Sequence, residues 1–188
     1  TWRYFETMVG EEDHWLPPDN YQEDPQPVVA HRTSPTNVGL LLLSSIAAHD
    51  FGYTATLELI ERLELTFTTL EKLPRFRGHF FNWYDTRSLQ PLMPQYVSTV
   101  DSGNLAGHLM VIKQTCLDLS DYPLMSKRIV EGLDDTVREM NREVENLGAL
   151  KQRTDAVPIR LLREEVNDCA RLLLAYPSTV FEWSQFVD

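Results

Sequence analysis

The chain has 188 residues, a length typical of one domain or two small ones. Apolar residues make up 43% of it, which is enough for a substantial core. The formal net charge of −11 argues against nucleic acid or an anionic membrane surface as the main partner, because both bind cationic surfaces. The longest apolar run, residues 38–48, is too short to cross a bilayer, and the sequence shows no signal-peptide pattern.

Cysteine and metal-ligand chemistry contribute little to the expected function. Cys116 and Cys169 are too few for a disulfide framework or a zinc site, and both lie in apolar helical patterns, so we expect buried free thiols. No set of His, Cys, Asp and Glu has metal-ligand spacing, and no glycine-rich phosphate loop is present. We therefore predict that the chain uses no cofactor. Because it begins at Thr1, we expect a segment of a longer polypeptide.

Hydrophobic periodicity predicts helices joined by two long ordered loops. Residues 2–9 have helical spacing and end at Gly10. Residues 11–33 hold several prolines and acids and show no period, so we expect a loop with Trp15 and Tyr21 as its anchors. Ser34 and Pro35 then predict the start of a helix that ends near Gly52 and is buried on every side.

A second helix should follow as the outer member of an αα-hairpin. Thr54 is its expected cap and Lys72 its last residue. Its expected buried face consists of regularly spaced apolar residues: Leu57, Ile60, Leu63, Phe67 and Leu70. The aromatic-rich second loop covers residues 75–97.

Three more helices are expected after this loop. The first is capped by Ser98 or Thr99 and continues to Leu119; its start repeats the pattern that begins at Thr33. The next runs from the Asp121 region to about Asn146 and is broken by Gly148; the last covers residues 155–175. Repeated hairpins with apolar inner helices are typical of a toroid or helical barrel. We predict one all-α domain over residues 1–188, with motifs in 1–120 and an amphipathic hairpin in 121–188.

Polar and aromatic residues cluster in the loop at residues 17–21 and at the starts of the two most apolar helices. If both helices line one bundle, the two helix starts fall on the same rim. Aromatic faces with Asp, Asn, Arg and His between them favour a neutral carbohydrate ligand. The candidate binding residues are His31, Arg32, Thr33, Asn37, Trp83, Tyr84, Asp85, Asp101 and Asn104.

Several of these residues also have structural interpretations. Asp101 could be the acidic residue of a helix first turn. Trp83 and Tyr84 could be loop anchors. His31 and Arg32 could form a pair at the rim whose hydrogen-bonding groups are already satisfied within the protein. Two other histidines, His49 and His108, lie in apolar helices and are expected in the core. Asp85 and Asp101 are the one candidate glycosidase pair, an interpretation that we do not favour.

The motifs resemble those of a known enzyme family. The strings LPPDNYQEDPQPVVAHRTSPTNVGLLLLSSIAAHDFGY and GHFFNWYDTRSLQPLMPQYVSTVDSGNLAGHL closely resemble cyclic β-1,2-glucan synthases, also described as glycosyltransferase-36 or NdvB-like proteins. The resemblance covers roughly residues 1–120. It implies a large parent enzyme at the cytoplasmic face of the bacterial inner membrane, which makes linear β-1,2-glucan and closes it into a ring by retaining transglycosylation.

The resemblance also implies what this segment can do alone. It places the segment at the start of a middle region that looks like an (α/α)₆ barrel related to glycoamylase-like domains, about twice as long as this chain. The catalytic carboxylates are then expected elsewhere, so a soluble, inactive segment would supply only glucan-binding residues. Its expected partners are a β-1,2-glucan oligosaccharide, the other domains of the parent chain and, through uncovered helix faces, a second copy. The alternatives are a phosphorylase-like region, which needs a phosphate site, or a non-catalytic helical scaffold.

Overall fold

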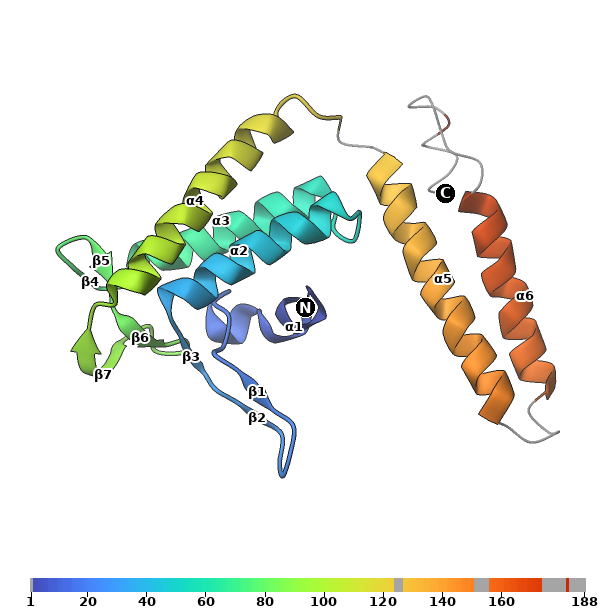
Figure 1. Ribbon diagram of the computed structural model, residues 1–188, viewed down its shortest axis with the longest axis horizontal. Coiled ribbons are helices and arrows are strands. Elements are labelled where there is room, and N and C mark those ends of the chain that lie inside the picture. The colour runs from blue at the N-terminus through green and yellow to red at the C-terminus, as the bar shows by residue number, and fades with distance from the viewer. Residues whose placement is uncertain (1, 124–126, 151–155, 174–181, 183–188) are drawn as a thin grey trace. The chain divides into compact units, whose positions relative to one another are not determined.

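The computed structural model describes residues 2–123, 127–150, 156–173 and 182 (Figure 1). The chain divides into two compact units. The first unit comprises residues 1–49 and 54–122, and the second comprises residues 50–53 and 123–188. Most of the described residues are helical and the strands are short, which confirms the predicted all-α class built from αα-hairpins.

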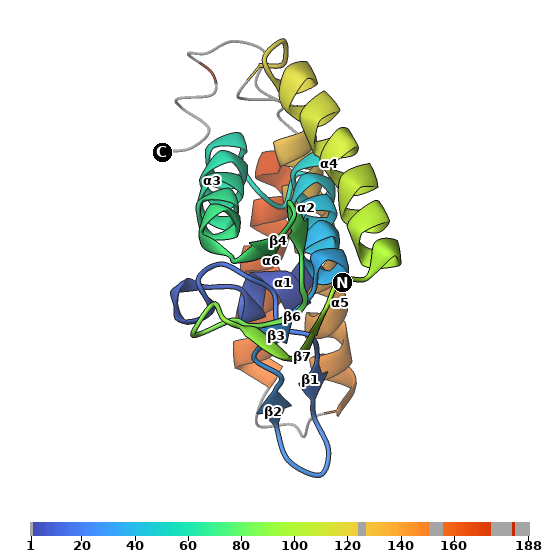
Figure 2. The ribbon, with the colours of Figure 1, turned by 90° about the vertical axis from the view of Figure 1, so that its left-hand side faces the viewer.

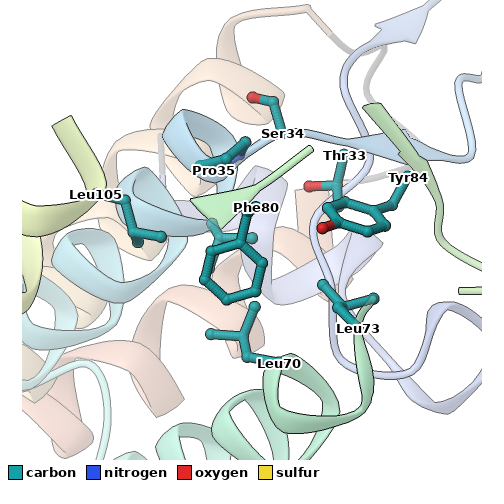
Figure 3. A pocket seen from close by; sticks show the side chains of 9 residues that line it. Thr33, Ser34, Pro35, Leu70, Leu73, Phe80, Tyr84 and Leu105 are labelled. Atoms are coloured by element: carbon teal, nitrogen blue, oxygen red, sulfur yellow. The ribbon is translucent and has the colours of Figure 1, made fainter. Parts of the chain in front are cut away.

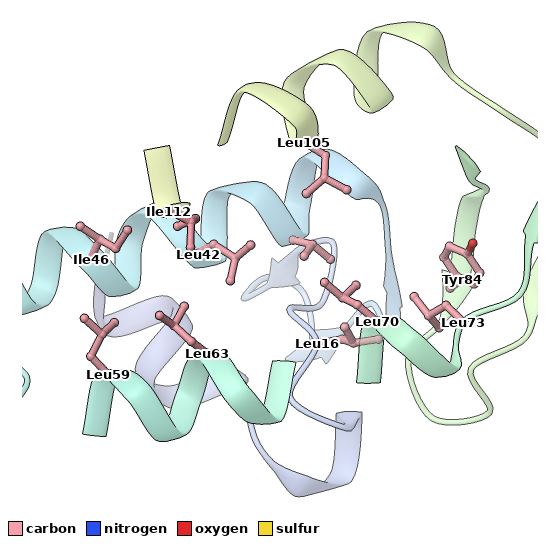
Figure 4. Packing of buried hydrophobic residues seen from close by; sticks show 11 residues of the cluster. Leu16, Leu42, Ile46, Leu59, Leu63, Leu70, Leu73, Tyr84, Leu105 and Ile112 are labelled. Atoms are coloured by element: carbon pink, nitrogen blue, oxygen red, sulfur yellow. The ribbon is translucent and has the colours of Figure 1, made fainter. Parts of the chain in front are cut away.

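Three helices form the body of the first unit. Helices α2 (Pro35–Asp50) and α3 (Thr56–Lys72) run in opposite directions, and α4 (Thr99–Leu119) lies against α2 (Figures 1 and 2). Their buried side chains make one cluster: Val38, Leu42 and Ile46 of α2, Leu59, Leu63 and Leu70 of α3, and Leu105 and Ile112 of α4 (Figure 4). Burial of each such side chain contributes about 1.5–3 kcal/mol, so this cluster holds the three helices together.

Helices α2 and α4 both begin with the predicted serine caps. The Ser34 hydroxyl accepts a hydrogen bond from the Asn37 backbone N–H at 3.3 Å, and the Ser98 hydroxyl accepts one from the Asp101 N–H at 3.2 Å. The two helices begin at the same end of the first unit, where the short strands gather (Figure 1). The two helix-start motifs therefore do share a rim.

The burial of α2 and α3 departs from the sequence prediction. Leu40 of α2 is 47% exposed, so this helix is not buried on every side. Thr54 does not cap α3, because Ala55 occupies the N-cap position and no side chain bonds there. The predicted face of α3 was also wrong in its first turns, since Leu57 and Ile60 are exposed while Leu59 is buried.

Two threonines explain the different buried face of α3. Thr66 donates a hydrogen bond to the Trp15 carbonyl at 3.2 Å, and Thr69 donates one to the His14 carbonyl at 2.7 Å. These bonds satisfy hydroxyl groups that would otherwise be costly to bury. The loop around residues 14 and 15 thus covers a face of α3 that includes polar side chains, and the apolar pattern alone did not identify it.

The two predicted loops contain short antiparallel strands. In chain order, the first segment consists of α1 (Trp2–Met8), the 3₁₀ helix η1 (Glu11–Asp13), β1 (Tyr21–Gln22), β2 (Val28–Val29) and β3 (Arg32–Thr33). The second contains β4 (Arg75–Phe76), β5 (His79–Phe80), β6 (Asn82–Asp85) and β7 (Pro91–Tyr96). β1 pairs with β2 and β4 with β5, while β3, β6 and β7 form a three-stranded sheet in that order. The sheet fixes the parts of both loops that carry the motifs.

The second unit contains an antiparallel pair of amphipathic helices, α5 (Lys127–Leu150) and α6 (Ala156–Leu173) (Figure 1). Val137 and Val144 of α5 pack with Val166 of α6. Helix α5 continues through Gly148, so the predicted break there was wrong; a glycine inside a helix costs only about 1 kcal/mol, which packing can offset. The predicted end of the last helix at residue 175 lies outside the described residues.

Both cysteines are exposed, which corrects the prediction of buried thiols. Cys116 lies in α4 beyond Ile112, the last buried residue of that helix, and Cys169 lies in α6. Apolar residues around a cysteine in the sequence do not bury it when the helix face itself stays uncovered. Within the described ranges, no helix combines the length and apolar character needed to cross a membrane.

Candidate functional site: a polar and aromatic rim

The three-stranded sheet sorts the motif residues onto two faces. Arg32 pairs with Asp85, and Thr33 pairs with Tyr84, in the antiparallel register of β3 and β6. Because side chains alternate along a strand, Thr33, Asn82 and Tyr84 lie on one face and are buried. Arg32, Trp83 and Asp85 lie on the other face and are at least partly accessible to solvent.

Tyr84 is a structural residue on the buried face. Only 1% of it is exposed, and its hydroxyl donates to the Pro74 carbonyl at 2.6 Å and accepts from the Phe81 N–H at 2.8 Å. Burial raises the pKa of Tyr84, although the hydrogen bond from Phe81 and the charge of Arg75 oppose this shift. This phenol therefore ties the β4–β5 segment to the sheet, and Thr33 lies beside it.

A small cavity lies next to these two residues on the core side. It has an apolar lining that includes Phe80, Leu70 and Leu105 (Figure 3). Among the described residues, the Thr33 hydroxyl is one of the buried polar atoms with no hydrogen-bond partner. An almost purely apolar lining does not suit a sugar, so we interpret this cavity as a gap in the core packing.

On the accessible face, four side chains form a group that we name the rim cluster: Asp19, Arg32, Asn37 and Trp83. The Asp19 carboxylate accepts hydrogen bonds from Arg32 Nη2 at 2.8 Å and Nε at 3.1 Å, and from Asn37 Nδ2 at 3.2 Å. The Arg32 guanidinium lies over the Trp83 ring, with Cζ 5.4 Å from the ring centroid. A cation stacked on an aromatic face in this way is stabilised by about 0.5–1 kcal/mol at an exposed site.

The first loop positions Asp19 rigidly. Pro17 and Pro18 are fully buried, and the Tyr4 hydroxyl donates to the Pro18 carbonyl at 3.0 Å. The Asp19 N–H then donates to the Ala30 carbonyl at 3.1 Å, which closes the base of the β1–β2 hairpin. Burial raises the pKa of Tyr4, and the nearby negative charge of Asp19 raises it further.

Asp101 lies at the start of α4 in a second polar group. Burial alone would raise the pKa of Asp101, but hydrogen bonds from the side chains of Ser98, Thr36 and Asn82, and from the Thr36 backbone, hold it below its usual value. Asn104, one turn along α4, donates to the Thr36 hydroxyl at 3.2 Å. These contacts join the first turns of α2 and α4 to strand β6.

Asp85 closes the turn between β6 and β7. Its Oδ1 accepts hydrogen bonds from the N–H groups of Ser88 at 2.7 Å and Arg87 at 3.1 Å, and from the Ser88 hydroxyl at 2.9 Å. The Ser88 N–H is the main cause that lowers the pKa of Asp85. This pattern is that of an Asx turn, so the carboxylate has a structural task.

His31 belongs to a buried network beneath the rim. Its Nδ1 lies 2.8 Å from Oδ1 of Asp13, a carboxylate in a residue that is only 5% exposed. The Thr86 hydroxyl donates to the same oxygen. The His31 ring is thus held by Asp13 of η1, whereas Arg32 is held by Asp19, so His31 and Arg32 have separate partners.

The structure therefore separates the predicted site residues by their surroundings. Arg32, Asn37 and Trp83 meet in the rim cluster, whereas Asp101 and Asn104 meet in the neighbouring group. Thr33 and Tyr84 face the core, and His31 and Asp85 hold loops. The individual roles of Asp13 and Asp19 were missed, although the polar loop at residues 17–21 was a signal for Asp19. Across the described residues, no group of His, Cys, Asp and Glu could hold a metal ion.

Comparison with known proteins supports the motif resemblance. No family profile matches the chain. The chain is 44% identical to the cyclic beta-(1,2)-glucan synthase NdvB of Rhizobium meliloti (strain 1021), over an alignment that covers 86% of the chain. The chain is similar to one segment of a cyclic glucan synthase. This confirms the resemblance that the motifs indicated. The segment is short, since the chain spans 7% of the length of that synthase.

A solved structure shows the same type of fold. The crystal structure of a glucoamylase-like protein from Bacteroides fragilis superimposes with a TM-score of 0.53 at 21% sequence identity. The superposition covers 61% of this chain and 28% of the other. This likeness, together with the helical hairpins, fits the predicted fragment of an α/α toroid.

Proposed function

We propose that this chain is part of a cyclic β-1,2-glucan synthase and supplies glucan-binding residues to the region that closes the ring by retaining transglycosylation. The observation that carries the proposal is the rim cluster, in which a guanidinium from the first motif lies over an indole from the second. The sequence similarity to a cyclic glucan synthase supports the choice of ligand.

The rim offers the two kinds of contact that a sugar needs. Trp83 is partly exposed, and the part of its indole that Arg32 does not cover provides an apolar surface for the C–H groups of a glucose ring. Arg32, whose side chain is 49% exposed, and Asn104, which is also exposed, provide donors and acceptors for hydroxyl groups. Because Asp19 neutralises Arg32, the rim suits an uncharged ligand, and a phosphorylase-like function would require an unpaired cation here.

The chain is proposed to be inactive by itself. Retaining transglycosylation needs two carboxyl groups about 5–5.5 Å apart, one of which is a free nucleophile. Oδ1 of Asp85 accepts the N–H groups of its own turn, and Asp101 accepts hydrogen bonds from Ser98, Thr36 and Asn82. We therefore place the catalytic carboxylates in other parts of the parent enzyme, whose glycosyltransferase region would act at the cytoplasmic face of the bacterial inner membrane.

Binding of linear β-1,2-gluco-oligosaccharides tests this proposal, with cello- and laminari-oligosaccharides as linkage controls. Tryptophan fluorescence should show saturable binding that is selective for the β-1,2 linkage. Trp83→Ala should reduce the affinity at least tenfold, because stacking on an aromatic ring contributes an appreciable part of the binding of a sugar. Trp2→Ala is the matched control, since Trp2 also has an arginine, Arg62, over its ring at 5.2 Å but belongs to α1.

An absence of binding at millimolar β-1,2-glucan, or equal binding of all three linkages, would contradict the proposal. A second candidate function then gains weight, namely a helical scaffold that packs against other domains. The exposure of Met110 (74%) and Val100 (70%) on α4 favours that candidate.

A further inference from the structure

We infer that Asp19 is a positioning residue, which holds the Arg32 guanidinium over Trp83 so that its remaining N–H donors point to the ligand. This inference rests on the proposed function and adds a residue to it.

The carboxylate of Asp19 already accepts four hydrogen bonds within the chain, which leaves little capacity for a sugar. An ionised carboxylate offers about four lone-pair sites on two oxygens. Oδ2 accepts from Arg32 Nε at 3.1 Å, Arg32 Nη2 at 2.8 Å and Asn20 Nδ2 at 3.1 Å, and Oδ1 accepts from Asn37 Nδ2 at 3.2 Å. Its side chain is only 17% exposed. Asp19 therefore acts on a ligand mainly through the residues it holds.

Arg32, in contrast, keeps donors available. A guanidinium has five N–H groups in a fixed plane, and two of them are directed at Asp19. The other three make no hydrogen bond to any residue that the structure describes, and the side chain is 49% exposed. The position of the guanidinium over the Trp83 ring places these donors beside the indole.

The anchors of Asp19 come from separate parts of the fold. Its backbone is held by the hairpin base at Ala30, and its Oδ1 reaches Asn37 in the first turn of α2. Arg32 itself is on β3, next to β6, which carries Trp83. One carboxylate thus connects the first loop, a helix start and the sheet, and it sets the position of donors next to an aromatic face. Preorganised donors of this kind improve binding because the ligand does not have to order them.

The test uses the whole chain and two readouts, one of which needs no sugar. The first is the Arg32 Nε–H resonance in a ¹H–¹⁵N spectrum, assigned by its absence in Arg32→Lys. The second is the affinity for a linear β-1,2-linked glucopentaose. In Asp19→Ala, we expect the Nε–H resonance to shift and exchange faster with water, and the affinity to fall at least tenfold. The control, Asp24→Ala, changes an exposed aspartate of the same loop and should alter neither readout.

The readouts separate this inference from the proposed function. An unchanged Nε–H resonance in Asp19→Ala overturns the inference, as does a changed resonance with unchanged sugar affinity. If the wild-type chain binds no sugar, the proposed function fails, and the resonance still shows whether Asp19 positions Arg32. Should Asp19→Ala not fold, Arg32→Lys keeps the charge but loses the planar donors, and an affinity equal to that of wild type would overturn the inference.

Discussion

The buried hydroxyl of Tyr84 shows how strand alternation divides the aromatic motif between folding and binding. Trp83 and Tyr84 are adjacent in sequence, yet one reaches the rim and the other the core. The sequence predicted both as candidates for a sugar platform or a loop anchor. The strand register decides between these roles and places Tyr84 in the core. The irregular loop sequence did not reveal this register.

Tyr84→Phe should destabilise the chain by about 1–3 kcal/mol. The change keeps the packed ring but removes the partner of the Pro74 carbonyl and of the Phe81 N–H, leaving both groups unsatisfied. Denaturant unfolding followed by circular dichroism measures this difference in free energy. Tyr96→Phe is the control. Because Tyr96 is 49% exposed, the loss of its hydroxyl should change the free energy of unfolding by less than about 0.5 kcal/mol.

The carboxylate of Asp85 should make stability depend on acid pH. A group with a lowered pKa in the folded chain stabilises the fold above its unfolded pKa, about 3.9, and this stabilisation is lost as the pH falls through the folded pKa. Asp85→Asn should therefore be less stable than wild type at pH 6, and the difference should shrink towards pH 2. A difference that is the same at both pH values would show that the charge of Asp85 does not stabilise the turn.

At the scale of helices, capping was more predictable than burial. Ser34 and Ser98 both cap the helices that the sequence indicated, because a cap depends on neighbouring residues only. The buried face of α3 depends instead on which loop covers it, and Thr66 and Thr69 reach loop carbonyls that are more than 50 positions away. Local pattern could not supply that information.

Replacing two glycines in neighbouring helices by alanine should change the stability of the chain in opposite directions. A Cβ at Gly39 of α2 would lie 1.9 Å from Nδ1 of His108, so the close contact between α2 and α4 requires a glycine there. Gly39→Ala should destabilise the chain by about 1–3 kcal/mol through overpacking. Gly107→Ala meets no atom within 4 Å and should stabilise α4 by about 0.5–1 kcal/mol. Thermal unfolding of both variants tests this, and equal effects would mean that α2 and α4 do not pack closely.

At the scale of the whole molecule, α4 has an apolar surface on the side away from its buried residues. At about 100° per residue, Met110, Val111 and Leu117 lie well away from the direction of Leu105 and Ile112. The three exposed side chains fit the prediction of an inner barrel helix. The sequence indicated this apolar character, but only the structure shows which of its faces is covered within the first unit.

This exposed face should cause the chain to self-associate. Sedimentation velocity at rising concentration should show oligomers, because a contiguous apolar surface on a helix favours association in water. Met110→Lys should shift the population towards monomer, whereas Met93→Lys, a change at an equally exposed residue of β7, should not. A wild-type chain that stays monomeric at high concentration would contradict this prediction.

The most direct test of the central claim is a ¹H–¹⁵N map of the chain during titration with a linear β-1,2-gluco-oligosaccharide. If the rim cluster binds the glucan, the largest shifts will belong to the Trp83 indole, the Arg32 guanidinium and the neighbouring Asn37 amide, with saturation at a common affinity. Resonances of α5 and α6 should stay in place. Shifts that centre on another surface, or no shifts at millimolar sugar, would contradict the claim that these two motifs form a glucan-binding rim.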